Sequence, residues 1–355
     1  MCDTYKHPSD PKEEIGLAEI NKLPTMDFVN ITGGEPFVRT DVADIVEALL
    51  PRAKRIVIST NGYFTERIVE LVKRFPQVGI RISIEGLQEA NDAIRGILDG
   101  YNRGLKTLYA LREMGIKDIG FGMTIQRLNA RDLIKLYQLS CELGYEFATA
   151  ALHNSHYFHK LDNSFSEEDK QVIIPEIEQL IAQLLKSNSP KKWFRAYFNH
   201  GLINYIKGNK RLLPCEMGTD GFFLDPVGDV LACNGMDTKM SMGNLKQSSF
   251  EEIWISEQAQ KVRAAVKNCP KNCWMIGSVA PAMKKNIFNP ALWVVQNKLF
   301  GYLARDRKRR LIYVLIVIAL LALFLFLYWW KCQLGINLCR EFSLSAFPPF
   351  KWLAR

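Results

Sequence analysis

Cysteine, a common protein ligand of zinc ions and iron–sulfur clusters, occurs in two separate places in this 355-residue chain that invite a metal-binding interpretation. Cys2 lies in the run MCDTY at residues 1–5. Much later, Cys215 and Cys233 are followed by the closely spaced pair Cys269 and Cys273. The first position offers one thiolate and the second offers four. The later four cysteines are therefore a candidate metal site by themselves, whereas Cys2 alone is not.

Five strand-like runs lie between these two regions. They cover residues 27–32, 55–60, 79–85, 119–125 and 147–152, and stretches of helical periodicity separate them, at residues 41–50, 66–75, 103–114 and 131–143. Regular alternation of strands and helices predicts a parallel sheet. Because ligands of such folds bind at the carboxyl ends of the strands, the residues that follow each run are candidate binding residues.

Polar and glycine-rich residues follow all five runs: GGEP at residues 33–36, NG at 61–62, EG at 85–86, QRLN at 126–129 and HNSH at 153–156. Adjacent glycines allow the backbone to approach a ligand closely, and the carboxylate of Glu35 is a suitable acceptor for a cationic amino group. Each motif alone is also explained as a turn. Their recurrence after all five runs favours a shared ligand.

The residues from Cys2 to about Leu152 resemble the radical S-adenosylmethionine (SAM) family. In that family a C-x3-C-x2-C loop gives three thiolates to a 4Fe–4S cluster, and its third cysteine is often preceded by Met and followed by Asp-x-Tyr. Cys2 matches this third cysteine, and the positions of the other two precede Met1. The resemblance implies a partial (β/α)6 TIM-type barrel over residues 1–160 that lacks its first strand.

The same resemblance implies that SAM binds along the strand ends. The glycines and Glu35 match the motif that binds the methionyl amino group, and the pair Arg95-Gly96 matches a segment that meets the carboxylate. The full set implied for the cofactor is Gly33, Gly34, Glu35, Pro36, Ser59, Asn61, Ser83, Glu85, Arg95, Thr124 and Asn129.

The four later cysteines suit either a structural zinc ion or an iron–sulfur cluster, and composition does not choose between them. Residues 225–231 (DPVGDVL) predict a hairpin between them. The pattern C-x2-G-x14-C, formed by Cys215, Gly218 and Cys233, is similar to the SPASM/twitch extension of radical SAM enzymes. This resemblance implies one auxiliary 4Fe–4S cluster, held by Cys215, Cys233, Cys269 and Cys273 within residues 211–280, after a helical connection at residues 161–210.

The function implied by the resemblance is that of a radical SAM enzyme. A reduced cluster would cleave SAM to a 5′-deoxyadenosyl radical, which abstracts hydrogen from a peptide, small-molecule or lipid-linked substrate. An electron donor such as flavodoxin or ferredoxin is implied as a partner. The competing hypothesis is an inactive, membrane-tethered scaffold whose four-cysteine domain holds zinc or an iron–sulfur cluster, because Cys2 is one thiolate where three are needed. A misplaced start codon is the third possibility.

The charge of the chain is concentrated near its end. Of the net charge of +9, +7 falls in residues 301–355, so the nearly neutral body argues against a nucleic-acid partner. Residues 311–330 carry no charge, and as a helix they match the roughly 30 Å core of a bilayer. This predicts a transmembrane helix after a basic segment at residues 281–310 and before a tail at residues 331–355, with a buried core helix as the alternative.

The basic cluster at residues 305–310 predicts, by the positive-inside rule, that the catalytic part lies on the cytoplasmic side of the cytoplasmic membrane in a single-pass protein. Cys332 and Cys339 then face the oxidising side, where they are free to pair. His153, His156 and His159 recur every three residues after the fifth run. They are a candidate metal site, with ordinary loop histidines as the alternative.

Overall fold

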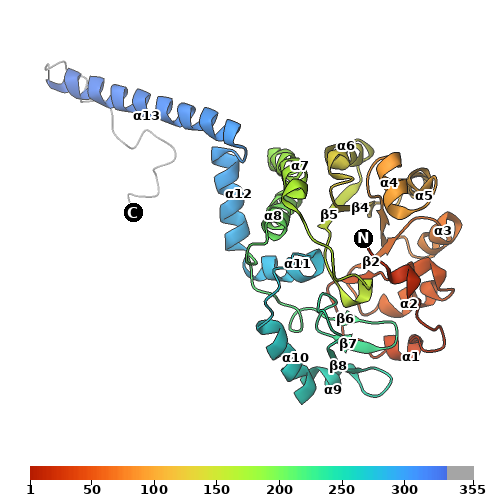
Figure 1. Cartoon of the computed structure of the whole chain (residues 1–355). Helices are drawn as coiled ribbons and strands as arrows, with labels where there is room; N and C mark the ends of the chain where they lie inside the picture. Colours follow the sequence, from red (N-terminus) through yellow and green to blue (C-terminus); the bar gives the residue numbers. More distant parts are fainter. Residues whose placement is uncertain (334–355) are drawn as a thin grey trace. The chain divides into compact units, whose positions relative to one another are not determined.

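The structure is a computed structural model that describes residues 1–333, and it divides the chain into two compact units, Met1–Val294 and Val295–Arg355. In the first unit, five parallel strands form one sheet in the order β1-β2-β3-β4-β5 (Figure 1). The strands are β1 (Val29–Ile31), β2 (Ile56–Thr60), β3 (Gly79–Ser83), β4 (Ile119–Ile125) and β5 (Glu146–Ala151). They lie within one residue or two of the predicted runs, which confirms the alternation.

The fully buried apolar side chains of the sheet lie on one of its faces. Ile58 pairs with Ile80, and Ile80 pairs with Ile119, so Ile58 and Ile80 share a face with Phe121 and Ile125, and all four are fully inaccessible to solvent. Polar residues such as Ser59, Arg81 and Ser83 alternate with them and are partly buried on the other face. In the described chain, β1 and β5 each pair with one neighbour, so the sheet is a five-stranded half-barrel with two edges.

The helices that connect the strands form an arc outside the sheet (Figure 1). They are α2 (Val42–Leu49), α3 (Thr65–Arg74), α4 (Gln88–Arg95), α5 (Gly100–Glu113) and α6 (Leu133–Leu143), and a short helix α1 (Leu17–Ile20) precedes β1. Four of them occupy the predicted helical stretches. The fifth, α4, was not predicted as a helix, and it ends at Gly96, whose φ of 65° requires the left-handed conformation that glycine adopts without strain.

Two long helices and a cysteine-rich part follow the half-barrel. Helices α7 (Glu167–Lys186) and α8 (Pro190–Ile206) pack against each other. An antiparallel sheet of β6 (Phe223–Leu224), β7 (Asp229–Leu231) and β8 (Ser241–Asn244) comes next, followed by α9 (Phe250–Ile255), α10 (Glu257–Lys267) and α11 (Ile276–Lys285). The pairing of β6 with β7 confirms the predicted hairpin.

The cysteine-rich part contacts the start of the chain and α8. Ile15 donates its backbone N–H to Pro226 O at 2.8 Å, which joins the N-terminal segment to the hairpin. In α8, a Cβ atom on Gly201 would lie 2.0 Å from the ring of Trp274, and the indole N–H of Trp274 bonds to Phe198 O at 2.8 Å. Only glycine at position 201 leaves room for this buried indole ring, which lies next to Cys273 in the chain.

The predicted transmembrane helix and membrane localisation are corrected by the structure. The apolar run 311–330 lies in α13 (Ala304–Gln333), which follows α12 (Phe288–Phe300). Within residues 1–333, no helix meets the combined length and hydropathy that a membrane crossing demands. Helix α13 also takes in the basic residues 305–310, so the charged and apolar stretches form one element. The single-pass anchor, the cytoplasmic-side assignment and the membrane partner are therefore withdrawn; Cys339 and the rest of residues 334–355 lie outside the described chain.

Candidate functional site

Cys2 lies beside the glycine-rich loop that follows β1. Its Sγ is 2.8 Å from the hydroxyl of Thr4, and that hydroxyl donates to Tyr157 O at 2.8 Å. A Cβ atom on Gly34 would lie 3.9 Å from the methyl group of Thr4. The start of the chain is thereby held over the carboxyl end of β1. The structure thus brings together Cys2 and the glycine-rich loop, which the sequence separates by some thirty residues.

The carboxylate of Glu35 connects the ends of β1 and β2. One oxygen accepts hydrogen bonds from the N–H of Phe37 at 3.1 Å and the hydroxyl of Thr60 at 2.7 Å, and the other accepts from the N–H of Asn61 at 2.7 Å. Pro36 begins the short 3-10 helix η2 (Pro36–Val38) that this carboxylate caps. Glu35 therefore has a structural role that the sequence motif does not reveal, while the backbone of Gly33 and Gly34 borders the loop.

Glu85 occupies the corresponding place after β3. Its side chain is 3% exposed, and it accepts the N–H of Thr124 at 2.6 Å and lies 3.5 Å from the guanidinium of Arg95. Burial raises the pKa of Glu85, against the opposing effects of Arg95 and the Thr124 N–H. Arg95 also donates to Ser83 O at 3.2 Å. Four of the predicted residues are therefore joined in one network at the ends of β3 and β4.

Two other predicted residues make contacts within the protein. Asn129 is fully buried; it accepts the N–H of Gln126 at 2.8 Å and donates to Thr124 O at 2.9 Å, which closes the loop after β4. Ser59 donates to the side chain of Asn30 at 3.0 Å. These hydrogen bonds give Asn129 and Ser59 a structural role at the rim that does not require a ligand.

A hollow at the rim gathers three of the predicted residues, Asn61, Ser83 and Arg95. Its volume of about 20 Å³ is small beside typical ligand pockets of several hundred Å³. The hollow is also lined by residues that sequence reasoning missed, Tyr63, Asn91, Ile97, Gly100 and Arg103. Asn91 lies in the segment that was compared with the family, but nothing in the sequence pointed to Tyr63 or Arg103, whose guanidinium lies 4.7 Å from the centre of the Tyr63 ring.

The four later cysteines are electrostatic neighbours. Burial raises the pKa of the Cys273 thiol to about 11, with Arg211 acting in the opposite direction and Cys215, Cys233 and Cys269 adding to the rise. Burial likewise raises the pKa of Cys233, and the backbone N–H groups of Gly235 and Met236 lower it. Four thiols that repel one another's charge are stable together as thiolates only when a cation lies among them.

This set fits an iron–sulfur cluster or zinc ion by its donor chemistry, since four thiols are what either group takes. Within residues 1–333, the structure shows no group of three or more His, Cys, Asp or Glu side chains already arranged to hold an ion. At the rim, Cys2 supplies one thiolate of the three that the family motif contains.

Gly218 explains the C-x2-G part of the cysteine motif. Its φ is 84°, and a Cβ atom there would lie 3.1 Å from the Cβ of Ala232, the residue before Cys233. The missing side chain therefore lets the Cys215 turn approach the Cys233 strand. Arg263 donates to Gly218 O at 2.7 Å and fixes α10 to this turn.

Residues 155–160, which we call the bridging segment, join the two cysteine regions. On one side, Tyr157 O accepts from Thr4, and Phe158 O accepts the N–H of Asp3 at 2.8 Å. On the other side, the N–H of His156 donates to Met236 O at 3.3 Å, close to Cys233. The phenol of Tyr157 donates to the buried Asp225 at 3.1 Å, which adds the hairpin to the same set of contacts.

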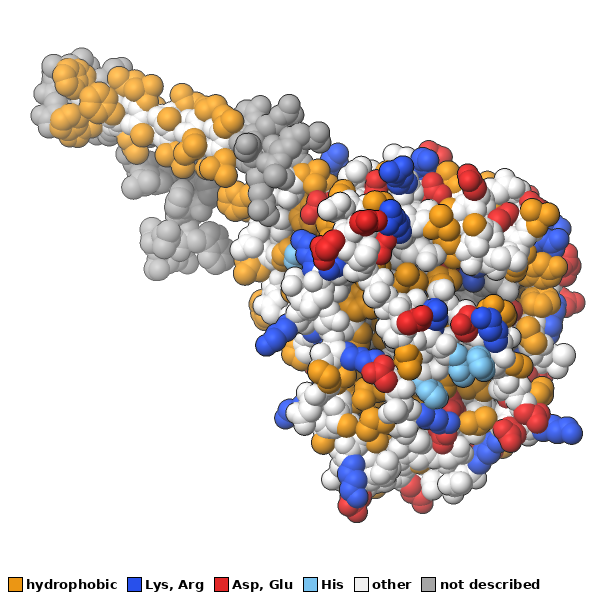
Figure 2. Space-filling model, in the orientation of Figure 1, with side chains coloured by type: hydrophobic (Ala, Val, Ile, Leu, Met, Phe, Trp, Pro, Cys, Tyr) orange, Lys and Arg blue, Asp and Glu red, His pale blue; other side chains and the backbone are white. Residues whose placement is uncertain are grey.

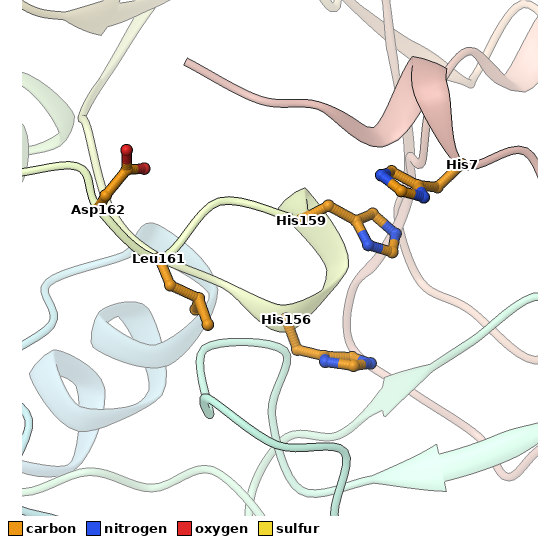
Figure 3. Close-up of a pocket in the computed structure, with 5 residues that line it drawn as sticks. All are labelled: His7, His156, His159, Leu161 and Asp162. Atoms are coloured by element: carbon orange, nitrogen blue, oxygen red, sulfur yellow. The ribbon is translucent and has the colours of Figure 1, made fainter.

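The histidines of the bridging segment form a cluster that the sequence only partly indicated. His156 and His159 line a cavity of about 600 Å³ together with His7, Leu161 and Asp162 (Figure 3). His153, which the sequence grouped with them, is instead mostly buried, and burial lowers its pKa. His7 was missed because about 150 residues separate it from its neighbours.

Family models match both parts of the chain. The model for the radical SAM superfamily matches residues 3–140, and a model described as an iron–sulfur cluster-binding domain (SPASM) matches residues 215–275. These ranges contain the half-barrel up to α6 and the four later cysteines. Domains of these two kinds imply 4Fe–4S clusters and SAM.

Among curated proteins, the chain is 34% identical over 131 residues to Fe-coproporphyrin III synthase of Methanosarcina barkeri, covering 36% of this chain and 32% of that one. It is 26% identical over 249 residues to the AdoMet-dependent heme synthase of the same organism, covering 63% and 67%. The chain thus spans between a third and two thirds of the length of these relatives.

A solved structure of native anSMEcpe with bound AdoMet and Cp18Cys peptide has a similar fold. The TM-score is 0.50 at 12% identity, and the alignment covers 79% of this chain and 90% of that one.

Proposed function

The chain is a radical SAM protein with a SPASM domain, and from this premise we propose that it uses SAM as a radical source to modify a peptide or small-molecule substrate. In such enzymes a reduced iron–sulfur cluster supplies the electron that cleaves SAM. We propose that residues of this chain bind SAM at the rim of the half-barrel, orient it, and exclude competing reactions.

The observation that carries this proposal is the placement of Cys2 against the glycine-rich loop, within the same rim as the Glu85, Arg95 and Thr124 network. We propose that SAM lies along this rim. The backbone of Gly33 and Gly34 then faces its amino group, and Arg95 faces its carboxylate. Asn61 and Ser83, which line the hollow beside Arg95, are suited to the polar atoms of the nucleoside.

Cys215, Cys233, Cys269 and Cys273 are proposed as the ligands of an auxiliary 4Fe–4S cluster. The chemistry of the four thiols and the raised pKa values of Cys233 and Cys273 support this, because a metal centre would relieve the mutual repulsion of four thiolates. The match of residues 215–275 to an iron–sulfur domain favours a cluster over zinc.

The class of substrate that we propose for this chain is inferred by analogy with its relatives. The name of one relative contains heme, and anSMEcpe was solved with a peptide. We propose a peptide or small molecule bound above the rim, and a reductant protein as the electron source.

The first experiment measures SAM binding and cleavage separately. Equilibrium dialysis with labelled SAM, after anaerobic reconstitution with iron and sulfide, gives the dissociation constant, and chromatography after dithionite addition gives 5′-deoxyadenosine. Arg95→Gln should weaken SAM binding about tenfold, because a charged hydrogen bond is lost. Arg52→Gln, in the loop between α2 and the amino end of β2, is the control. A melting curve for each variant shows whether it folds.

Each result has a direct meaning. SAM binding that depends on Arg95 together with 5′-deoxyadenosine formation supports the enzyme. SAM binding without cleavage, in a chain that has taken up iron and is reduced, favours a binding function and rejects radical catalysis. Equal SAM affinity of the Arg95 and Arg52 variants rejects the proposed position of the SAM carboxylate.

A further inference from the structure

The cavity at the bridging segment is large enough for a ligand. Its volume of about 600 Å³ lies within the usual range of small-molecule sites, and it is open to solvent, with the lining side chains of His7 and His159 exposed. Figure 3 shows His7 on the N-terminal segment facing His159 of the bridging segment, with the ring of His156 beside them. Histidine side chains also gather on the face shown in Figure 2. This cavity is separate from the hollow at Asn61, Ser83 and Arg95.

The imidazoles of His7, His156 and His159 are unused by the protein. Across residues 1–333, no hydrogen bond or ion pair that the structure shows involves their ring nitrogens; their contacts are ring contacts. The rings of His7 and His159 stack with centroids 3.9 Å apart, and His156 lies 6.2 Å from His159. Six ring nitrogens that can donate or accept are therefore available to a ligand.

The backbone at this cavity is strained. His159 has φ 49° and ψ 34°, the left-handed conformation that residues other than glycine seldom adopt. Two backbone hydrogen bonds hold it there, from His159 N–H to His156 O at 3.1 Å and from Ser155 N–H to Lys160 O at 3.2 Å. Strained residues of this kind concentrate at ligand sites, where the surrounding structure fixes them for a purpose other than stability.

The carboxylates around the cavity do not oppose an anion, because they already have cationic partners. Asp3, which acts electrostatically on His159, lies 3.1 Å from Lys6, and Asp162, which lines the cavity, lies 2.9 Å from Lys160. Figure 3 also shows the Asp162 carboxylate pointing away from the imidazoles. Burial lowers the pKa of His159, as do His7 and His156, while Asp3 raises it. An anion among the three rings would relieve their mutual repulsion.

A metal ion fits this cluster less well than an anion. Stacked imidazoles present their faces to each other, whereas metal ligation needs ring nitrogens that converge on one point.

We propose, building on the proposed function, that this cavity binds a carboxylate of the substrate and that an acidic side chain of a peptide is its source. The exposed side chain of Leu161 contacts the methylene groups of that side chain. Because Thr4 and the Asp3 N–H bond to the bridging segment, a substrate held here lies against the same N-terminal turn that carries Cys2.

The test uses the five histidines of the full chain as reporters. Selective labelling with 13C at the ring Cε1 gives five NMR signals, of which His153 and His200 are internal controls because burial lowers the pKa of each. The probe is the blocked tetrapeptide Gly-Glu-Glu-Gly, compared with Gly-Gln-Gln-Gly and with glutarate. No SAM, iron or reductant is added.

At pH 5 the Glu peptide should shift the signals of His7, His156 and His159 and leave the two controls in place. Because the pKa of His159 is lowered and only a protonated imidazole carries the charge that attracts the carboxylate, the dissociation constant should rise about tenfold between pH 5 and pH 8. His159→Asn, which tolerates the left-handed backbone, and His7→Gln should each weaken binding about fivefold. Lys54→Gln, at the amino end of β2, is the matched control.

If glutarate binds as tightly as the Glu peptide, the cavity binds carboxylates as proposed, but the source of the carboxylate is a small molecule and not a peptide. Equal binding of the Glu and Gln peptides, or Glu-peptide affinity unchanged in both histidine variants, would overturn the proposal. A negative result for peptide binding would not change the measured SAM binding or cleavage. A negative result for SAM cleavage would likewise not change peptide binding. The two proposals can therefore be rejected independently.

Discussion

At the scale of single residues, the carboxylates at the two ends of the half-barrel have different roles. At the carboxyl ends of the strands, Glu35 accepts hydrogen bonds from Phe37, Thr60 and Asn61 and so fixes the loop on which the proposed SAM site depends. At the amino ends, Asp118 accepts hydrogen bonds from Arg55 and Arg81. Substitutions of Glu35 and of Asp118 can therefore test the structure, and neither test requires the cofactor.

Replacing Glu35 by alanine should lower the free energy of unfolding by about 2–4 kcal/mol, because three donors lose a charged acceptor at once. Urea unfolding followed by circular dichroism measures this. Glu89→Ala, at an exposed position in the first turn of α4, should change stability by less than about 0.5 kcal/mol. Equal effects of the two changes would refute the connecting role of Glu35.

Asp118 should make stability depend on pH in acid. Burial raises the pKa of Asp118, but the hydrogen bonds from Arg55 and Arg81 outweigh it and lower the pKa to about 2. Because the folded pKa lies below the unfolded value of 3.8, the stabilisation is complete above pH 4 and is lost as the pH falls towards 2. Asp118→Asn should therefore cost about 1–2 kcal/mol at pH 7, allowing for partial exposure, and much less at pH 2.

Denaturant unfolding at pH 7 and at pH 2 measures this difference. Asp27→Asn removes the exposed ion pair with Lys54 and should leave stability unchanged at both values. If Asp118→Asn lowers the free energy of unfolding equally at both pH values, the arginine contacts do not act through the charge of the carboxylate.

At the scale of elements, the contact between α8 and the chain near Cys273 depends on one missing side chain. A Cβ atom at Gly201 would overlap the ring of Trp274, whose indole is 2% exposed and bonded to Phe198 O. The clash involves backbone and a rigid ring, so neither partner moves aside easily. The packing of Trp274 against α8 thereby fixes the position of the neighbouring residue, Cys273.

Gly201→Ala should lower the free energy of unfolding by about 1–3 kcal/mol, although alanine favours a helix over glycine by about 1 kcal/mol. Gly277→Ala, in α11, meets no atom within 4 Å and should be neutral or stabilising. Thermal unfolding of both variants gives the comparison. A stabilised Gly201→Ala protein would mean that α8 and Trp274 are not in the contact described above.

At the scale of the whole molecule, much of the half-barrel was predictable from sequence, because each strand is rich in apolar residues and is followed by polar or glycine-rich residues. The histidine cluster was not predictable as a whole, since His7 meets His159 only after the chain has folded through all five strands. The internal bonds of Glu35 and Asn129 were also hidden, because a motif gives residue types and no partners. The prediction for residues 311–330 from apolar length alone was wrong: these residues lie in α13 with the basic residues 305–310, and within residues 1–333 no helix qualifies as a membrane span.

Loading the cysteine-rich part with iron and sulfide should stabilise the whole first unit, because ligand binding to the folded state alone raises its stability. We expect a higher melting temperature after anaerobic reconstitution. Cys233→Ser should lower bound iron and reduce this rise, whereas Cys141→Ser, an exposed cysteine of α6, should leave both unchanged. Iron content and calorimetry measure the two effects, and equal iron in both variants would exclude Cys233 as a ligand.

The bridging segment also sets a distance. Its backbone groups bond to Thr4 beside Cys2 at one point and to Met236 near Cys233 at another. The separation of the two thiol regions is therefore determined by the covalent length of a few residues. Exchanging side chains there leaves this separation intact, whereas inserting a single residue between Ser155 and Tyr157 would move one region relative to the other and alter any electron exchange between them.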